Sequence, residues 1–143
     1  NIVNTDLDVF VSKELGGEVI YKPLDEIYNS GTLQIRKSKP IIYVNEYESY
    51  LRTRFTIAHE IGHYFLHSNF GKINITINRS GENERVEWEA NWFAAGFLMP
   101  KKRFVEEYKI NKEDLITLSD IFQVSSSAVQ YRIKFLESIK ALN

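Results

Sequence analysis

The spacing of hydrophobic residues changes several times along the chain. Near the N-terminus, apolar residues recur at helical spacing over 5–15, and Gly16 and Gly17 then interrupt the pattern. Three segments rich in β-branched and aromatic residues follow at 18–22, 32–36 and 41–45, with turn residues between them. We therefore expect an N-terminal helix followed by three short strands in a meander.

Helical spacing returns in the middle of the chain. Over 48–67 the apolar residues occupy most of the circumference of a helix, which is typical of a helix buried in a core. The alternating segment 72–80 predicts a strand or an extended loop. A second helix is expected to begin after an N-cap at Asn83 and to end at about residue 98, just before Pro100.

The last third of the chain, 101–143, is expected to form short helices. Within it, 113–136 has the pattern of a helix-turn-helix, with Ser125 as the N-cap of the second helix. Eight basic and six acidic side chains give the segment a charge of only +2, a weak footprint for DNA. We expect it to dock a substrate or to complete the core. If it did contact DNA, the contacts would fall on Gln130, Arg132 and Lys134.

Composition narrows the class of protein. The 143 residues are 43% hydrophobic and 26% charged, as in one globular domain, and the net charge of −1 gives no strong uniform field for nucleic acid or membranes. The absence of cysteine excludes disulfides, thiolate metal sites and cysteine nucleophiles. No apolar run approaches the roughly 20 residues that span a bilayer, and no signal-peptide pattern occurs at the start. We expect a soluble, cytoplasmic protein, and the first residue, Asn1, leaves open a longer parent chain.

A metal-binding pattern lies inside the central predicted helix. Residues 59–63 read H-E-x-x-H, so His59 and His63 are one turn apart on the same face and can both reach one ion. Glu60 lies about 100° around the helix, off this row but able to address a water on the metal. Because the flanking residues are apolar, burying these polar groups without a metal would be costly. The motif therefore predicts Zn²⁺ bound by His59 and His63, with Glu60 as the catalytic carboxylate.

A catalytic zinc site needs a third protein ligand and one open position. His67 continues the row but stands about 12 Å along the helix from His59, so one ion cannot bind both. We expect His67 to be a partly exposed residue at the helix C-terminus. The remaining candidates are the acidic residues of the second predicted helix, Glu82, Glu84, Glu87 and Glu89.

Among these carboxylates we favour Glu87. Asn91 follows it by four residues on the same helical face, where its amide can orient a ligating histidine. Glu89 points to another side of the helix beside Arg85, and a solvated or ion-paired position is expected for it. Glu89 remains the alternative ligand.

Two stretches of the sequence resemble a known family. They are RFTIAHEIGHYFLH at 54–67 and EWEANWFAAGFLMP at 87–100. Both resemble the ImmA/IrrE family of zinc metallopeptidases, and the similarity is strong over about 41–100. Phe97 stands where the family usually has Leu, which is a conservative departure. The resemblance implies that His59, His63 and Glu87 bind Zn²⁺ and that Glu60 is the catalytic carboxylate.

The resemblance also implies an architecture and a substrate. The expected fold is an α+β, zincin-like metallopeptidase domain with a small β-sheet, two central ligand-bearing helices and C-terminal helix-turn-helix-like helices. The sheet would form one wall and the C-terminal helices the other. A single domain over 1–143 would comprise an N-terminal helix and β meander (1–47), a zinc-binding core (48–100) and a C-terminal helical segment (101–143).

Members of this family are bacterial or phage-borne proteases that cut a cognate helix-turn-helix repressor, so the expected partner is such a repressor and not DNA. Two other functions stay open. One is a non-catalytic DNA-binding regulator with a structural zinc, and the other is the toxin of a toxin–antitoxin pair. Glu60 separates the first from a peptidase, because a structural zinc site needs no general base and favours a fourth protein ligand.

Overall fold

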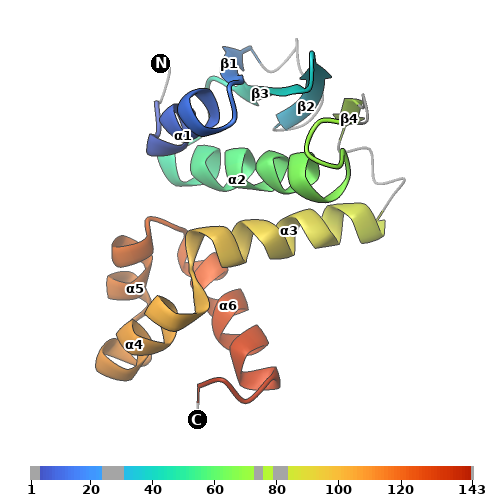
Figure 1. Cartoon of the computed structure of the whole chain (residues 1–143). Helices are drawn as coiled ribbons and strands as arrows, with labels where there is room; N and C mark the ends of the chain where they lie inside the picture. Colours follow the sequence, from blue (N-terminus) through green and yellow to red (C-terminus); the bar gives the residue numbers. More distant parts are fainter. Residues whose placement is uncertain (1–3, 24–30, 73–75, 79–83, 143) are drawn as a thin grey trace. The chain divides into compact units, whose positions relative to one another are not determined.

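The computed structural model describes residues 4–23, 31–72, 76–78 and 84–142. The chain divides into two compact units, Asn1–Ala94 and Ala95–Asn143. The elements, labelled in Figure 1, are α1 (Asp6–Glu14), β1 (Glu18–Lys22), β2 (Gly31–Arg36), β3 (Lys39–Asn45), α2 (Tyr50–Leu66), β4 (Thr76–Asn78), α3 (Glu84–Leu98), α4 (Lys101–Asn111), α5 (Leu115–Phe122) and α6 (Ser126–Ser138). The expected fold class, α+β with a small sheet and two central helices, is confirmed. That all 143 residues form one domain, with its sheet and C-terminal helices as two walls, stays a prediction.

Side-chain caps fix where several of the helices begin. The hydroxyl of Thr5 accepts a hydrogen bond from the backbone N–H of Leu7, which starts α1. Ser49 caps α2 in the same way. The predicted cap of α6, Ser125, is confirmed by its bond from the N–H of Ala128. The cap predicted at Asn83 lies outside the described residues.

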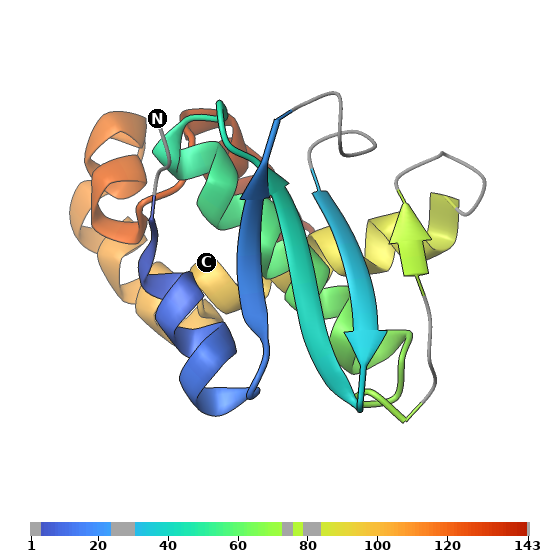
Figure 2. The same ribbon diagram turned by 90° about the horizontal axis from the view of Figure 1, so that it is seen from above.

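The four strands form one sheet in the order β1-β3-β2-β4 (Figure 2). The three predicted strands are present, but the predicted meander is wrong, because β1 pairs in parallel with β3 and not with β2. β2 pairs antiparallel with both β3 and β4. The reason lies in β3, whose nearly continuous apolar run at 41–44 is best buried between two neighbouring strands. β1 is half-exposed along its length and takes the edge position.

The core of the first unit lies between the sheet and α2. Leu33 and Ile42 of the sheet and Ile57 and Ile61 of α2 are all fully buried. α2 contacts β2 and β3, while α1 contacts both β1 and α2. Figure 1 shows α3 on the opposite side of α2 from the sheet. α2 is thus covered on two sides, which explains the apolar circumference in its sequence.

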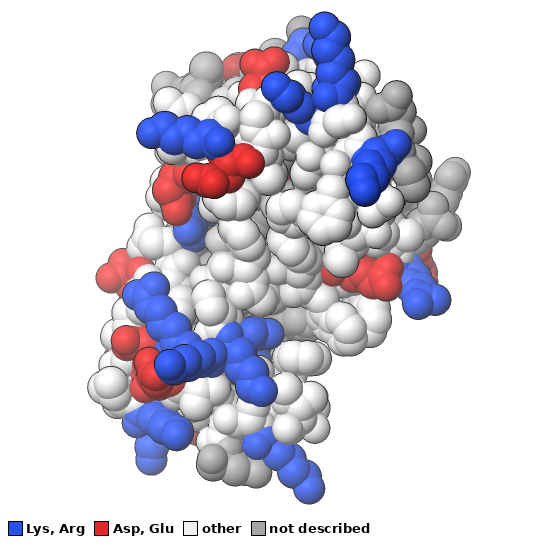
Figure 3. Space-filling model, in the orientation of Figure 1, with Lys and Arg blue, Asp and Glu red and all other residues white. Residues whose placement is uncertain are grey.

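The second unit is a small helical cluster. α5 contacts both α4 and α6, and its Phe122 ring lies 5.3 Å from the ring of Phe104, centroid to centroid. Two helices joined by a short turn confirm the predicted helix-turn-helix pattern. Acidic side chains lie among the basic ones on both units (Figure 3).

Arg132 corrects one expectation about this unit. It is only 8% exposed, and its Nε–H donates to the backbone carbonyl of Met99 at 3.1 Å. Burial also lowers the pKa of its guanidinium. A buried side chain that closes the turn between α3 and α4 has no surface to offer to DNA, so the contact considered for Arg132 is wrong. Across the described parts of the chain, no helix has the length and apolarity needed to cross a bilayer.

Candidate metal centre

Three potential ligands meet where α2 packs against α3. The Nε2 atoms of His59 and His63 lie 3.0 Å apart. A carboxylate oxygen of Glu87 lies 2.7 Å from Nε2 of His59 and 3.4 Å from Nε2 of His63. The ligand atoms of these three residues all lie within 4.8 Å of one another. The three groups named from the sequence are therefore neighbours in space.

The spacing of these atoms suits a small divalent cation. Four ligands at about 2.0–2.1 Å around a tetrahedral ion are about 3.3 Å from one another. The three separations, 2.7, 3.0 and 3.4 Å, lie at or somewhat below that value. Two imidazole nitrogens and one carboxylate oxygen form the donor set of many catalytic zinc sites. The residues present therefore fit a zinc ion.

Asn91 determines how the ring of His59 is oriented. The Oδ1 atom of Asn91 lies 2.7 Å from Nδ1 of His59. Because a carbonyl oxygen only accepts, the proton of His59 resides on Nδ1. The lone pair of Nε2 then faces Glu87 and His63, where a cation would need it.

His63 is held in its neutral form by its surroundings. Its side chain is fully buried, and burial, followed by the nearby His59, lowers its pKa to about 3. The carboxylate of Glu87 acts in the opposite direction but does not offset these effects. At neutral pH His63 therefore needs to lose no proton before it binds a metal.

Glu60, the predicted catalytic carboxylate, is completely buried in α2. Its Oε1 atom lies beneath the start of β2, where a Cβ atom added to Gly31 would be 3.2 Å away. The absence of a side chain at Gly31 leaves room for the carboxylate.

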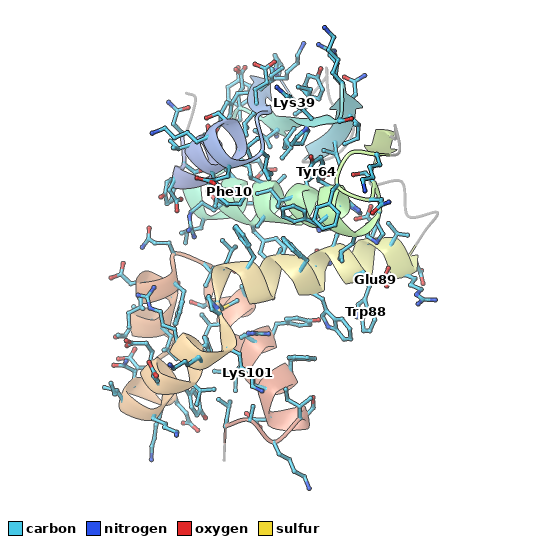
Figure 4. The ribbon with its side chains drawn as sticks, viewed as in Figure 1. Phe10, Lys39, Tyr64, Trp88, Glu89 and Lys101 are labelled. Atoms are coloured by element: carbon cyan, nitrogen blue, oxygen red, sulfur yellow. The ribbon has the colours of Figure 1, made fainter. Side chains whose placement is uncertain are left out.

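The other acidic candidates lie elsewhere. Glu89 lies 3.1 Å from Nε2 of His67 and 3.7 Å from Nε of Arg85, and it is not among the three clustered ligands. The expected ion pair with Arg85 is therefore present. Glu84 is exposed and also outside the cluster, and Glu82 lies outside the described residues. Figure 4 shows Glu89 and Trp88 on α3, with Trp88 on the side away from α2.

Sequence reasoning gave His67 too small a part. Its Nδ1 lies 2.9 Å from Nδ1 of His63, so the half-buried ring contacts a candidate ligand directly. The i, i+4 spacing from His63 is the sequence signal for this contact.

Comparison with known proteins assigns the chain to a family. The family model for Peptidase_M78, the IrrE N-terminal-like domain, matches residues 12–134. This chain belongs to the Peptidase_M78 family. The resemblance to ImmA/IrrE proteins is thereby confirmed, and the pair of ligand-bearing helices is the part of this Peptidase_M78 chain that carries the candidate site.

Two relatives are similar to this Peptidase_M78 chain. Metallopeptidase ImmA of Bacillus subtilis (strain 168) is 26% identical over 113 residues, which cover 76% of this chain and 65% of that protein. A solved structure of a Mycobacterium tuberculosis transcriptional regulator superposes with a TM-score of 0.67 at 18% identity, and covers 96% of this chain and 42% of that one. The likeness to the regulator shows the fold alone. The chain spans less than two thirds of the length of either relative.

Proposed function

We propose that this protein is a zinc-dependent endopeptidase. The observation that carries the proposal is the cluster of His59, His63 and Glu87, with all ligand atoms within 4.8 Å, in a chain of a peptidase family. In this proposal the three residues bind Zn²⁺, Asn91 orients His59, and Glu60 is the general base.

The donor set favours a catalytic over a structural zinc. Structural zinc sites are closed by four protein ligands and usually include cysteine, which this chain lacks. Among the described residues three protein ligands cluster, and such a set leaves one position for water and substrate. The regulator with a structural zinc is therefore the weaker alternative.

In the proposed hydrolysis of a peptide bond, the zinc ion and the side chains of the protein have separate roles. When bound, Zn²⁺ acidifies a water and polarises the carbonyl of the scissile peptide bond. Glu60 accepts the proton of the attacking water and delivers it to the leaving amine. Its place one residue after His59 and off the ligand row supports that role. Asn91 holds the ring of His59 with Nε2 toward the site, and burial keeps His63 neutral.

The substrate we propose is a cognate helix-turn-helix repressor, cut in the cytoplasm. The similarity to ImmA/IrrE proteins supports this substrate class, and B. subtilis ImmA is itself named as a metallopeptidase. The site alone supports peptide hydrolysis in general, so the repressor is the finer part of the proposal.

Metal content tests the ligands. The purified protein should hold about one Zn²⁺ per chain, and elemental analysis should find much less in His59→Ala, His63→Ala and Glu87→Ala, because each removes one of three ligands. Glu84→Gln, on the exposed face of the same helix, is the matched control and should keep its zinc. If Glu87→Ala kept its zinc while Glu89→Ala lost it, the wrong carboxylate would have been chosen.

Cleavage tests the activity. We expect the zinc-loaded protein to cut one helix-turn-helix protein encoded beside its own gene at a single position, identified by mass spectrometry. Glu60→Gln should retain the fold and the zinc but lose far more than tenfold in rate, because an amide of equal size cannot accept the proton. Cleavage by this variant at the wild-type rate would refute the general-base role. Growth arrest that depends on Glu60, without any repressor cleavage, would favour a toxin.

A further inference from the structure

We propose that His67 and Glu89 are positioning residues that hold His63 as a metal ligand through a chain of hydrogen bonds. The inference rests on the proposed zinc site. Nδ1 of His63 lies 2.9 Å from Nδ1 of His67, and Nε2 of His67 lies 3.1 Å from Oε1 of Glu89. Three side chains are thus connected end to end, from the buried site to the half-exposed carboxylate of Glu89.

Glu89, the last group in this series of hydrogen bonds, determines which ring nitrogen carries each proton. The carboxylate of Glu89 only accepts, so the proton on His67 is on Nε2 and its Nδ1 presents a lone pair. That lone pair must receive a proton from Nδ1 of His63. His63 is then left with an unprotonated Nε2, the atom that faces His59 and Glu87. The tautomer required for metal binding is the one that the hydrogen-bond chain selects.

A hydrogen bond donated in the opposite direction, from His67 to His63, would prevent His63 from binding a metal. If Nδ1 of His67 donated to His63, the remaining proton of neutral His63 would be on Nε2, which would block ligation. With its proton on Nδ1, His67 would turn an unprotonated Nε2 toward the carboxylate of Glu89 at 3.1 Å, where two acceptors repel. Glu89 therefore penalises the wrong tautomer.

The hydrogen bonds from His63 through His67 to Glu89 also link the two ligand-bearing helices. His67 is the C-cap residue of α2, and Glu89 lies on α3, so the contact joins the end of one ligand-bearing helix to the other. Arg85 lies 3.7 Å from the second oxygen of Glu89. Each candidate histidine ligand then has a second partner: Asn91 for His59 and His67 for His63.

Nitrogen NMR tests the proton arrangement without any substitution. The chain has only three histidines, so a ¹⁵N-histidine sample of the zinc-loaded protein gives six ring nitrogens to assign. We expect the proton of His67 on Nε2, and a scalar coupling between the Nδ1 atoms of His63 and His67 across the hydrogen bond. A proton on Nδ1 of His67, or the absence of that coupling, would overturn the inference.

Metal affinity tests the consequence, measured by competition of a chelator for Zn²⁺. His67→Phe keeps a ring but removes the acceptor, and should weaken zinc binding about 10- to 100-fold. His67→Asn offers an amide oxygen at the position of Nδ1 and should recover most of the loss, which a merely space-filling role would not explain. Glu89→Gln should weaken binding less than His67→Phe, because its amide oxygen can still accept. Glu84→Gln is the matched control and should bind like wild type.

The outcomes separate this inference from the proposed function. If His67→Phe bound zinc as tightly as wild type while His63→Ala did not bind, only the positioning role would fall. If the wild-type protein itself held no zinc, the proposed function would fall first. Should His67→Phe not fold, the NMR measurement on the wild type and the affinity of His67→Asn still decide the matter.

Discussion

Gly31 is the residue at which the sheet comes closest to the proposed general base. A Cβ atom added there would lie 2.6 Å from Cγ2 of Thr56 and 3.2 Å from Oε1 of Glu60. The first of these separations is shorter than van der Waals contact allows, and both neighbours belong to a buried face of α2. Glycine at this position therefore serves close packing against α2, and through it the space available to Glu60.

Replacing Gly31 by alanine tests this packing. Gly31→Ala should lower the free energy of unfolding by about 1–3 kcal/mol, because overpacking forces the strand or the helix to move. The measurement is urea unfolding of the zinc-loaded protein. Adding Thr56→Ser removes the methyl group of the closest contact and should recover much of the loss. Equal stability of Gly31→Ala and wild type would show that the space is not tight.

The sequence alone predicts some residues of the candidate site and misses others. His59, Glu60 and His63 form a local motif, and the four-residue spacing of Glu87 and Asn91 carried enough information to bring both to the cluster. Gly31 could not be found in this way, because nothing local tells which strand position faces a helix distant in the sequence.

The contact between α2 and α3 depends on Gly62 in the middle of the H-E-x-x-H motif. A Cβ atom there would lie 3.0 Å from Cβ and 3.1 Å from Cγ of Phe93, so the small residue lets the helices approach closely. This approach brings Glu87 of one helix to the two histidines of the other.

Gly62→Ala should therefore act on the metal site more than on the fold. Phe93 would have to shift by a few tenths of an ångström, and we expect several-fold weaker zinc binding in a chelator competition with only a small change in unfolding. Gly96→Ala, at a position of α3 where an added Cβ meets nothing within 4 Å, is the matched control. It should stabilise the helix by about 0.5–1 kcal/mol and leave zinc binding unchanged. Equal zinc affinity of the two variants would contradict this role of Gly62.

A charged contact links α1 to α2. Nε and Nη2 of Arg54 donate to the two carboxylate oxygens of Asp6 at 2.9 and 3.2 Å. These hydrogen bonds hold the pKa of Asp6 below its ordinary value of about 3.9, against the opposing effect of partial burial. The contact therefore stabilises the folded protein above that value, and this contribution is lost as the pH falls through the lower pKa of the folded state.

Asp6→Asn should reveal this pH dependence. Because the Asp6 side chain is 61% exposed, we expect the variant to be less stable than wild type by no more than about 1 kcal/mol at pH 7. The difference in stability between wild type and variant should be smaller at pH 3. Urea unfolding of metal-free protein at both pH values measures it, and Glu106→Gln, an exposed change on α4, should give no difference at either. A difference in stability that grew toward low pH would contradict this prediction.

The elements themselves were more predictable than their pairing. Apolar periodicity correctly predicted α1 and α2, and periodicity together with the cap at Ser125 predicted α6, since these signals are local. The parallel pairing of β1 with β3 depends on which edge of β3 is left for a partner, and no short-range pattern records that.

At the scale of the whole molecule, the mixed surface charge argues against DNA as a partner. The net charge is −1, and acidic side chains are interspersed among the basic ones of the C-terminal segment. Gln130 and Lys134 are exposed on α6, whereas Arg132 is buried. Specific duplex binding relies on several phosphate contacts, which the interspersed carboxylates would oppose.

We therefore expect poor affinity for DNA and a role of α6 in substrate engagement. In a fluorescence assay, the wild-type protein should not bind its own promoter region in the nanomolar range at physiological salt. Neutral changes at Gln130 and Lys134, such as Gln130→Ala with Lys134→Gln, should leave zinc content intact and change cleavage of a folded repressor. Nanomolar, salt-dependent binding to a defined operator would instead favour a regulator.

The position of β1 also bears on how copies of the protein behave toward one another. β1 covers one edge of β3, whose segment 41–44 is apolar, rich in β-branched residues and uncharged. A protein shortened to begin at Pro23 would present that edge as a row of unpaired N–H and C=O groups, which is a template for adding strands from other chains. β1 contributes none of the proposed ligands, yet its pairing with β3 should oppose aggregation. Where the N-terminus is cut would then decide whether the shortened protein stays dispersed in solution.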